Sequence, residues 1–357
     1  MNPNSDARWL SCAPTMVASS STLLSDSLPQ SRQAPTTPVV SNVFIHVTNA
    51  CNLRCTYCYA CASQPLCDEL TTAEILRLLS DIVTIRPRKV VFTGGEPLLR
   101  EDILTLLEGL RDGDPEHEIR RCLNTNGWFI TEHVAMQLVG LVDEIRVSID
   151  ALAERNDALR GVGSFEAAVF ALDVCRLVGF EPRAMVTITP TSLADLQDLI
   201  YFLVERKINR ISFNVVRPVG RGARDEGFGV NLQEAQVAVN KACKRCFPCA
   251  PRTPQTPRSK MQAECGLGNF VNIMANGDVY PCHVLNQQQF FVGNVREENC
   301  SAITRRISAF GKSVASAFAL SALSHSSSGT QLRVCPGITP AVLFKEASNT
   351  LRESGDA

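Results

Sequence analysis

Three cysteines, Cys51, Cys55 and Cys58, follow a short apolar stretch of the chain in a C-x3-C-x2-C arrangement. Thiolates spaced this closely on one loop can converge on a single iron–sulfur cluster. A [4Fe–4S] cluster that receives only three protein ligands keeps one iron free for another molecule. The spacing therefore predicts a cluster with an open coordination position.

Two other uses of these cysteines stay open from the sequence. Structural zinc takes four closed ligands, and catalytic zinc usually includes histidine or carboxylate, so a three-cysteine loop suits zinc less well. Disulfides or inert thiols are the other option, since the chain has 15 cysteines in 357 residues. The N-terminal residues lack the basic and apolar segments of a signal peptide, so we expect a cytoplasmic protein, in which clustered cysteines indicate metal or redox chemistry.

Composition argues against two classes of partner. The chain carries 35 basic and 36 acidic residues, for a net charge of −1, and shows no basic stripe. We therefore expect no nucleic-acid partner. No stretch approaches the about 18 apolar residues of a membrane span, so we expect no membrane partner either.

A repeating pattern of β-rich runs and helical segments begins at Val43 and is typical of parallel βα units. Strands are expected over residues 43–47, 89–93, 119–124, 144–149, 183–189 and 210–216. Helices are expected over residues 71–85, 100–111, 131–141, 164–178 and 192–205. The expected fold is α/β, an open (β/α)6 TIM-like partial barrel, which places its chemistry at the C-terminal strand ends.

Four short motifs fall at those strand ends. The cysteine loop follows the first expected strand, Gly94-Gly-Glu-Pro97 the second, Asn124-Thr-Asn-Gly127 the third, and Ser148-Ile-Asp150 closes the fourth. Alone, the third motif could be a simple turn and the fourth a strand end. Their shared position on one rim indicates a single site.

The cysteine spacing and Thr93-Gly-Gly-Glu-Pro97 together resemble the signature of the radical S-adenosylmethionine (SAM) superfamily. The resemblance implies that Cys51, Cys55 and Cys58 hold a [4Fe–4S] cluster whose free iron chelates SAM. One electron, from reduced flavodoxin or ferredoxin, then cleaves SAM to methionine and a 5′-deoxyadenosyl radical that abstracts hydrogen from a substrate.

The same resemblance assigns SAM contacts. Gly94, Gly95 and Glu96 match the segment that accepts hydrogen bonds from the SAM amino group, and the glycines would let a ligand approach the backbone closely. Asn126 and Ser148 match polar positions that contact the ribose or the methionine part of SAM.

Two further residues have less certain roles. Arg160 could pair with the SAM carboxylate, because a planar guanidinium suits bidentate recognition, or it could be a surface arginine at a loop end. Tyr57 matches an aromatic position of the family loop, where it would pack near the adenine or shield the cluster.

A second cysteine system follows the expected barrel. Cys265, Gly277 and Cys282 fit the C-x(9–15)-G-x4-C pattern of SPASM and twitch extensions, which carry auxiliary [4Fe–4S] clusters in radical SAM enzymes that often modify peptides. Asn276-Gly277-Asp278 predicts a β-hairpin that joins the two cysteines, although a plain hairpin with two buried thiols would look the same.

One auxiliary cluster is favoured, because the later cysteine block of a full SPASM domain is missing. Its expected ligands are an upstream cysteine, the two hairpin cysteines and a downstream one, namely Cys249, Cys265, Cys282 and Cys335. A second auxiliary cluster, built from the C-x2-C-x2-C run that starts at Cys243 and borrowing Cys300, stays open.

His283 occupies the position where sulfatase-maturing relatives carry an aspartate base, which counts against sulfatase maturation. Histidine can itself accept a proton near neutral pH, or it can donate to a cluster sulfur. We therefore keep His283 as a catalytic candidate.

The sequence thus predicts a radical SAM enzyme with four segments: a disordered Ser/Pro-rich extension (1–40), the barrel (41–235), a SPASM- or twitch-like domain (236–345) and a tail (346–357). A peptide is the favoured substrate, and a small molecule of cofactor or secondary-metabolite biosynthesis is the alternative. A non-catalytic electron carrier is the alternative of another class, but it needs no SAM site and would leave the Gly94–Glu96 segment unexplained.

Overall fold

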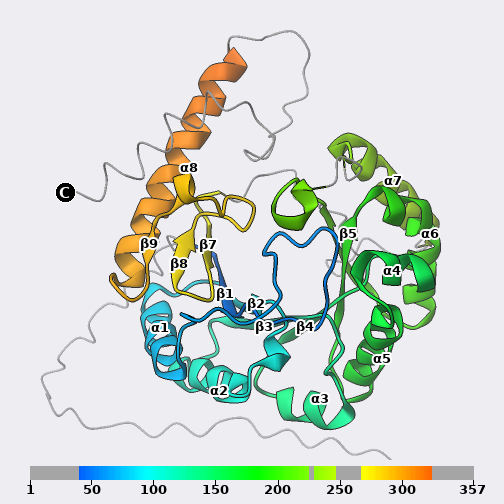
Figure 1. Cartoon of the computed structure of the whole chain (residues 1–357), viewed down its shortest axis with the longest axis horizontal. Coiled ribbons are helices and arrows are strands. Elements are labelled where there is room, and N and C mark those ends of the chain that lie inside the picture. The colour runs from blue at the N-terminus through cyan, green and yellow to red at the C-terminus, as the bar shows by residue number, and fades with distance from the viewer. Residues whose placement is uncertain (1–39, 225–228, 247–266, 324–357) are drawn as a thin grey trace, which may run out of the picture. The chain divides into compact units, whose positions relative to one another are not determined.

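The computed structural model describes residues 40–224, 229–246 and 267–323 (Figure 1). These residues form one nine-stranded sheet in the order β6-β5-β4-β3-β2-β1-β7-β8-β9. Strands β1 to β6 pair in parallel, with bounds Asn42–Thr48, Lys89–Gly94, Arg120–Thr125, Glu144–Ser148, Arg183–Ile188 and Arg210–Val215. In the described part, β6 and β9 are the two free edges, so the barrel is partial, as predicted.

Helices connect the parallel strands and lie along one face of the sheet (Figure 1). They are α1 (Thr72–Ile85), α2 (Ile103–Gly113), α3 (Glu132–Leu138), α4 (Ala153–Arg160), α5 (Ser164–Leu177) and α6 (Pro190–Glu205). Apolar stripes, such as Ile75, Leu79 and Ile82 of α1, pack on strand residues such as Val90 and Phe92. The predicted capping box of Thr71 and Glu74 begins α1.

Helix α4 was not predicted, because its eight residues carry no apolar stripe. Asn156, Leu159 and Arg160 are its buried residues. The carboxylate of Asp157 on α4 accepts hydrogen bonds from the backbone N–H groups of Gly163 (2.6 Å) and Phe165 (2.8 Å). These bonds satisfy free donors at the start of α5, so α4 fixes where α5 begins.

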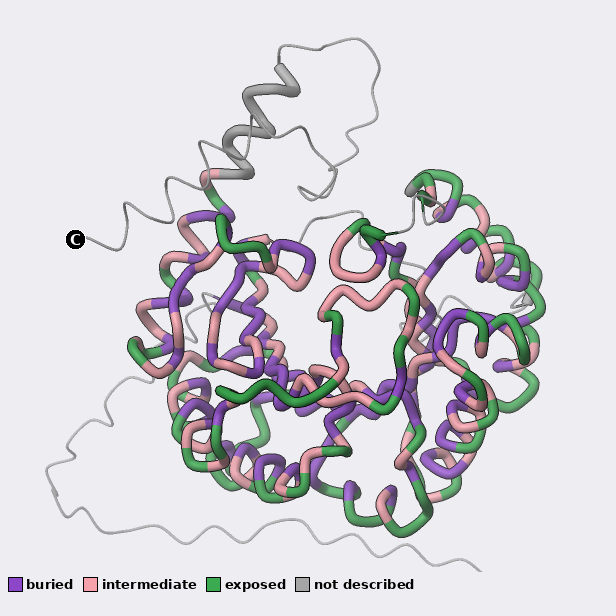
Figure 2. The backbone as a smooth tube through the Cα atoms, viewed as in Figure 1, coloured by how far each residue is buried: buried purple, intermediate pink, exposed green. Residues whose placement is uncertain are grey.

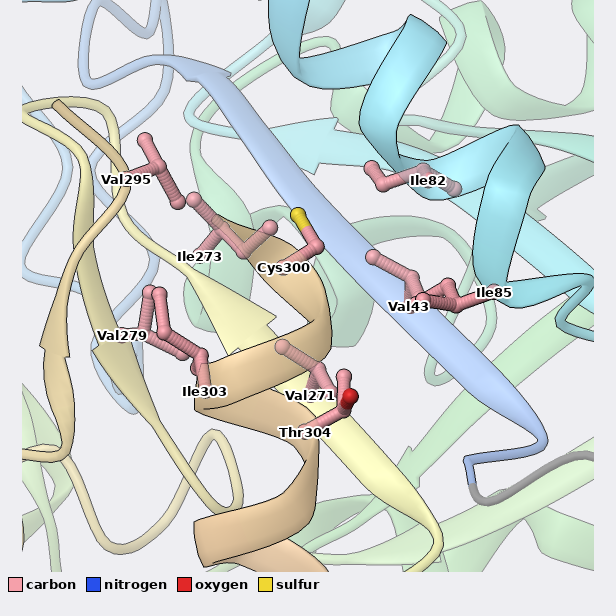
Figure 3. Close-up of a pocket in the computed structure, with 10 residues that line it drawn as sticks. All are labelled: Val43, Ile82, Ile85, Val271, Ile273, Val279, Val295, Cys300, Ile303 and Thr304. Atoms are coloured by element: carbon pink, nitrogen blue, oxygen red, sulfur yellow. The ribbon is translucent and has the colours of Figure 1, made fainter. Parts of the chain in front are cut away.

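The C-terminal part joins the same sheet. Strands β7 (Phe270–Ile273) and β8 (Asp278–Tyr280) form the predicted antiparallel hairpin, and β7 pairs in parallel with β1. A short strand, β9 (Gly293–Asn294), and helix α8 (Cys300–Leu323) follow. Figure 3 shows a small apolar pocket where α8 approaches β1, β7 and α1.

The two faces of the parallel sheet differ in chemistry. The face under the helices is apolar, as Val90 and Phe92 illustrate. Figure 2 shows in purple that much of the backbone of the strands belongs to buried residues. Because side chains alternate along a strand, the neighbouring residues Lys89 and Thr93 lie on the other face, called here the inward face. Helix α7 (Leu232–Cys246) packs against α6. None of the described helices is long and apolar enough to span a membrane.

Candidate active site

Cys51, Cys55 and Cys58 lie half-buried in the loop that follows β1. Burial, with smaller contributions from the charges of Glu96, Cys55 and Cys58, raises the pKa of Cys51 to about 11. The N–H of Leu53 donates to Cys51 Sγ over 3.4 Å. Soft thiolate donors in this number fit an iron–sulfur cluster with one open iron. No His, Cys, Asp and Glu group of the described residues is arranged to hold a single metal ion.

The segment after β6 holds the cysteine loop in place. Arg221 donates from Nε to the carbonyl of Cys55 (2.7 Å) and from Nη1 to that of Ala62 (3.1 Å). Gly220 has φ +59°, and a Cβ there would lie 2.4 Å from the carbonyl oxygen of Cys58. This contact was not predicted, although the two glycines around Arg221 indicate a close backbone approach.

We therefore expect Gly220→Ala to destabilise the protein. The left-handed backbone costs a non-glycine residue about 1–2 kcal/mol, and the clash with Cys58 costs a further about 1–3 kcal/mol. Gly140→Ala is the matched control, because Gly140 has φ +79° and no atom within 4 Å of an added Cβ. Urea unfolding of both variants measures the difference, and equal losses would contradict the close contact.

The two glycines after β2 serve the neighbouring loop. A Cβ on Gly94 would lie 2.3 Å from the carbonyl oxygen of Thr48, and one on Gly95 would lie 2.1 Å from that of Ala50. The Gly95 N–H donates to the Thr48 carbonyl over 2.8 Å. These glycines were predicted to let a ligand approach, and in the structure the backbone of residues 48–50 lies against both of them.

Glu96 is fully buried and links the rims of β2 and β3. Its carboxylate accepts hydrogen bonds from Thr125 Oγ1 (2.8 Å) and from the N–H of Asn126 (2.7 Å). Burial raises the pKa of Glu96 to about 7, although these hydrogen bonds oppose the rise. Glu96 is thus a carboxyl group whose charge changes near neutral pH. Thr125 was not predicted, although it lies within the third rim motif.

Asn126 connects the third rim motif to the cysteine loop. Its Nδ2 donates to Asn52 Oδ1 (2.8 Å), and its Oδ1 accepts from the N–H of Trp128 (2.9 Å). Ser148 lies half-buried at the end of β4, on the same rim. The structure thus brings Glu96, Asn126 and the cysteine loop into direct contact and places Ser148 two strands away from Glu96.

Arg160 is buried, so the alternative of a surface arginine is wrong. Its Nη1 donates to Asp150 Oδ2 (3.0 Å) and to the hydroxyl of Tyr57 (2.6 Å), and Tyr57 also donates to Asp150. The other Asp150 oxygen accepts from the N–H of Thr187 over 2.7 Å. Arg160 Nε is buried and has no hydrogen-bond partner among the described residues. Asp150 was not predicted in this network, although it ends the fourth rim motif.

Cys282 and His283 follow β8 and lie near the cysteine loop, which they approach at Tyr59. The His283 ring lies 5.2 Å from the Tyr59 ring and 6.3 Å from the Phe44 ring. Burial and the charge of Arg217 lower the pKa of His283 to about 4, so its ring is neutral at neutral pH. Burial, followed by the charges of Cys58 and Cys282, raises the pKa of Tyr59. Tyr59 therefore lies close to both thiols, a contact that the sequence analysis missed.

The other predicted auxiliary ligands, Cys249, Cys265 and Cys335, lie outside the described residues. Cys300 lies in the apolar pocket of Figure 3, next to Val43 and Ile303, and burial raises its pKa to about 12. This environment disfavours the thiolate that a cluster ligand requires, which counts against Cys300 as a ligand.

Comparison with protein families gives a match to the Radical SAM superfamily over residues 45–203. The Fe-coproporphyrin III synthase of Methanosarcina barkeri is 33% identical over 204 residues, which cover 56% of this chain and 50% of the relative. The mycofactocin maturase MftC of Mycobacterium ulcerans is 30% identical over 263 residues, which cover 70% of each chain. This chain therefore spans half the length of the Fe-coproporphyrin III synthase that it matches.

Two solved structures show the same fold. SuiB of Streptococcus suis bound to SAM has a TM-score of 0.59 at 20% identity, covering 73% of this chain and 64% of SuiB. The enzyme anSMEcpe with bound SAM has a TM-score of 0.58 at 16% identity, covering 88% of this chain and 96% of that chain.

Proposed function

Because the chain belongs to the radical SAM superfamily, we propose that Cys51, Cys55 and Cys58 hold a [4Fe–4S] cluster and that the protein cleaves SAM reductively. The main support is that these three cysteines lie half-buried in one loop, at the rim where Glu96 and Asn126 are also anchored. A closed electron carrier would need a fourth protein ligand for this cluster, which the C-x3-C-x2-C motif does not supply.

The rim residues then bind SAM. Cys51, Cys55 and Cys58 would hold the cluster, which would supply the single electron for cleavage of SAM to methionine and the 5′-deoxyadenosyl radical that would abstract hydrogen from the substrate. Glu96, in its ionised form, accepts from the SAM amino group beside Gly94 and Gly95. Asn126 and Ser148 contact the ribose or methionine part. Our assignment of the SAM carboxylate to Arg160 rests on the free donor at its Nε, since its Nη1 is already bonded to Asp150.

Tyr57 has a positioning role in this proposal. Its hydroxyl is bonded to both Arg160 and Asp150, so its ring is fixed between two cluster cysteines of the loop. From that position it shields the cluster from solvent.

For the substrate, the similarity to a mycofactocin maturase supports a peptide in natural-product maturation. The similarity to Fe-coproporphyrin III synthase supports the alternative of a small molecule. The electron donor is a reduced flavodoxin or ferredoxin, because the proposed cluster must receive single electrons.

The proposal is tested by anaerobic reconstitution of the full chain with iron and sulfide. On reduction with dithionite, it should convert SAM to 5′-deoxyadenosine and methionine, which liquid chromatography measures. Protein that binds iron yet forms no 5′-deoxyadenosine would overturn the proposed function.

We also propose one auxiliary [4Fe–4S] cluster on Cys249, Cys265, Cys282 and Cys335. His283, next to Cys282, would serve as the base for the substrate or as a donor to the cluster. The neutral ring next to Tyr59 can donate one N–H, which suits the donor role, whereas a pKa lowered to about 4 makes the ring a weak base.

The auxiliary cluster predicts an iron content. A variant with Cys51, Cys55 and Cys58 all changed to alanine should keep about four irons per chain, the content of one [4Fe–4S] cluster. Adding Cys282→Ala to that variant should remove most of this iron. A folded triple variant that holds no iron would contradict the auxiliary cluster.

A further inference from the structure

A group of charged residues lies at the opposite end of the sheet from the rim. Each of strands β2 to β6 begins with a charged residue, and Arg146 follows on the same face of β4. We call the five cations the basal cluster: Lys89, Arg120, Arg146, Arg183 and Arg210.

These cations converge on a single carboxylate, that of Glu144, which is 2% exposed. Oε1 of Glu144 accepts from Nε of Arg146 (2.9 Å) and from Nε of Arg183 (2.5 Å). Its Oε2 lies 2.7 Å from Nη2 of Arg120 and 3.0 Å from Nη2 of Arg210. Four guanidinium groups therefore share one negative charge.

Among the described residues, no other inward-facing strand carboxylate balances the positive charge of the cluster. The strands β2 to β6 are described in full, and Glu144 is the one carboxylate among their inward-facing residues. Arg210 has a second acidic neighbour, Glu181, but that contact is 4.0 Å long and exposed. Burial, followed by the charge of Arg146, lowers the pKa of Lys89 to about 8. Arg146 is buried, whereas Arg120, Arg183 and Arg210 are partly exposed, so solvent offsets only part of the excess positive charge and a bound anion would stabilise the cluster.

Some N–H donors of these guanidinium groups make only weak hydrogen bonds within the protein. Nη2 of Arg146 contacts only the sulfur of Cys122 (3.5 Å), and Nη1 of Arg183 donates to the hydroxyl of Ser212 (3.2 Å). A carboxylate or phosphate is a stronger acceptor for a guanidinium fork than a thiol or a hydroxyl. The side chains of Arg183 and Arg210 are 24% and 27% exposed, so such an anion has access to them.

The basal cluster and the rim share the inward face of the sheet. Ser148 stands four residues beyond Glu144 on β4, and a strand rises about 3.3 Å per residue, so the rim is about 13 Å from the cluster. A ligand of that length would reach from the cations to the place where SAM is proposed to bind.

We propose that the basal cluster binds an anionic group of the substrate, a carboxylate or a phosphate, while the carbon to be attacked lies near the rim. That the ligand is the substrate rests on the proposed function, whereas the binding of the anion depends only on the arginines. The cluster then sets both the charge class of the substrate and its orientation.

The test measures anion binding to the full chain without SAM or reductant. Citrate and pyrophosphate, as carboxylate and phosphate probes, are titrated calorimetrically at about 0.15 M salt, which screens weak surface binding. We expect saturable binding of at least one probe and at least about tenfold weaker binding by Arg183→Gln, because one lost charge-assisted contact corresponds to about that factor. Arg206→Gln is the control, since Arg206 is an ion-paired arginine close to the start of β6 but pairs with Asp173 of α5 (2.9 Å), in the helix layer and outside the basal cluster.

Each outcome decides the proposal. Preference for citrate assigns a carboxylate and preference for pyrophosphate a phosphate, provided that Arg183→Gln weakens the binding and Arg206→Gln does not. Arg183→Lys, which keeps the charge but not the fork, should be intermediate and replaces the glutamine variant if that one does not fold. No saturable binding of either probe, or equal weakening by Arg206→Gln, overturns the proposal. Because SAM is absent, a failure of SAM cleavage leaves this result unaffected.

Discussion

Replacing Cys55 with alanine is expected to abolish the reductive cleavage of SAM by the reconstituted protein. The two remaining thiols of the loop, Cys51 and Cys58, supply too few ligands to hold a cubane. Changes that touch only the partners of metal ligands already cost about 10–100-fold, so we expect the loss of a ligand to cost at least about 100-fold. The loop itself should persist, because Arg221 contacts the backbone carbonyl of residue 55 rather than its side chain.

The measurement is 5′-deoxyadenosine formed per chain under anaerobic, dithionite-reduced conditions. Cys67→Ala is the matched control, since Cys67 lies close in sequence, is exposed and falls outside the C-x3-C-x2-C motif. It should behave as the unmodified protein does. Undiminished cleavage by Cys55→Ala would remove the role assigned to the loop.

The strands were predictable because each carries regularly placed apolar residues between helical segments. Some of these residues form a continuous run, as Val90 to Phe92 of β2 do, whereas Ile211, Phe213 and Val215 of β6 alternate with polar residues. Both patterns placed all six strands within two residues of their observed ends. Helix α4 was missed because packing of Asn156 and Arg160, both polar, holds it in place. Its stability comes from tertiary contacts that no local pattern records.

The candidate site likewise combines features that are local in the sequence with contacts between distant residues. The cysteines and rim motifs are local in sequence, so their common location followed from the order of strands and loops. The contact between Arg221 and Cys55 joins residues 166 positions apart, and the position of Tyr59 beside His283 depends on the pairing of β7 with β1. Such contacts depend on which strands become neighbours in the folded sheet.

The basal cluster of charges also depends on which strands become neighbours. Arg146, Arg183 and Arg210 belong to three strands, and each looks like an ordinary surface arginine in the sequence. Lateral register brings them together, since Arg146 pairs with Arg183 and Arg183 pairs with Arg210. The direction of each side chain then follows from the alternation along each strand.

Glu144→Gln is expected to destabilise the protein strongly, because Glu144 is the common partner of these arginines. Removing one partner of a buried ion pair costs about 3–5 kcal/mol, and the partial exposure of Arg120 and Arg210 favours the lower end. Urea unfolding at neutral pH should therefore show a loss of about 3 kcal/mol. Glu118→Gln is the control, since its pair with Arg86 is exposed and 3.9 Å long, and it should change stability little.

The effect of Glu144→Gln should depend on pH in one direction. Burial alone would raise the pKa of Glu144, but the charges of Arg146, Arg183 and Arg210 outweigh it and lower the pKa from 4.5 to about 2. The ionised group therefore stabilises the fold fully above pH 4.5, and this stabilisation is lost as the pH falls towards 2. The difference in unfolding free energy between the unmodified protein and the variant should shrink across that interval. A difference that stays constant down to the lowest pH at which both remain folded would show that the arginines do not hold Glu144 ionised.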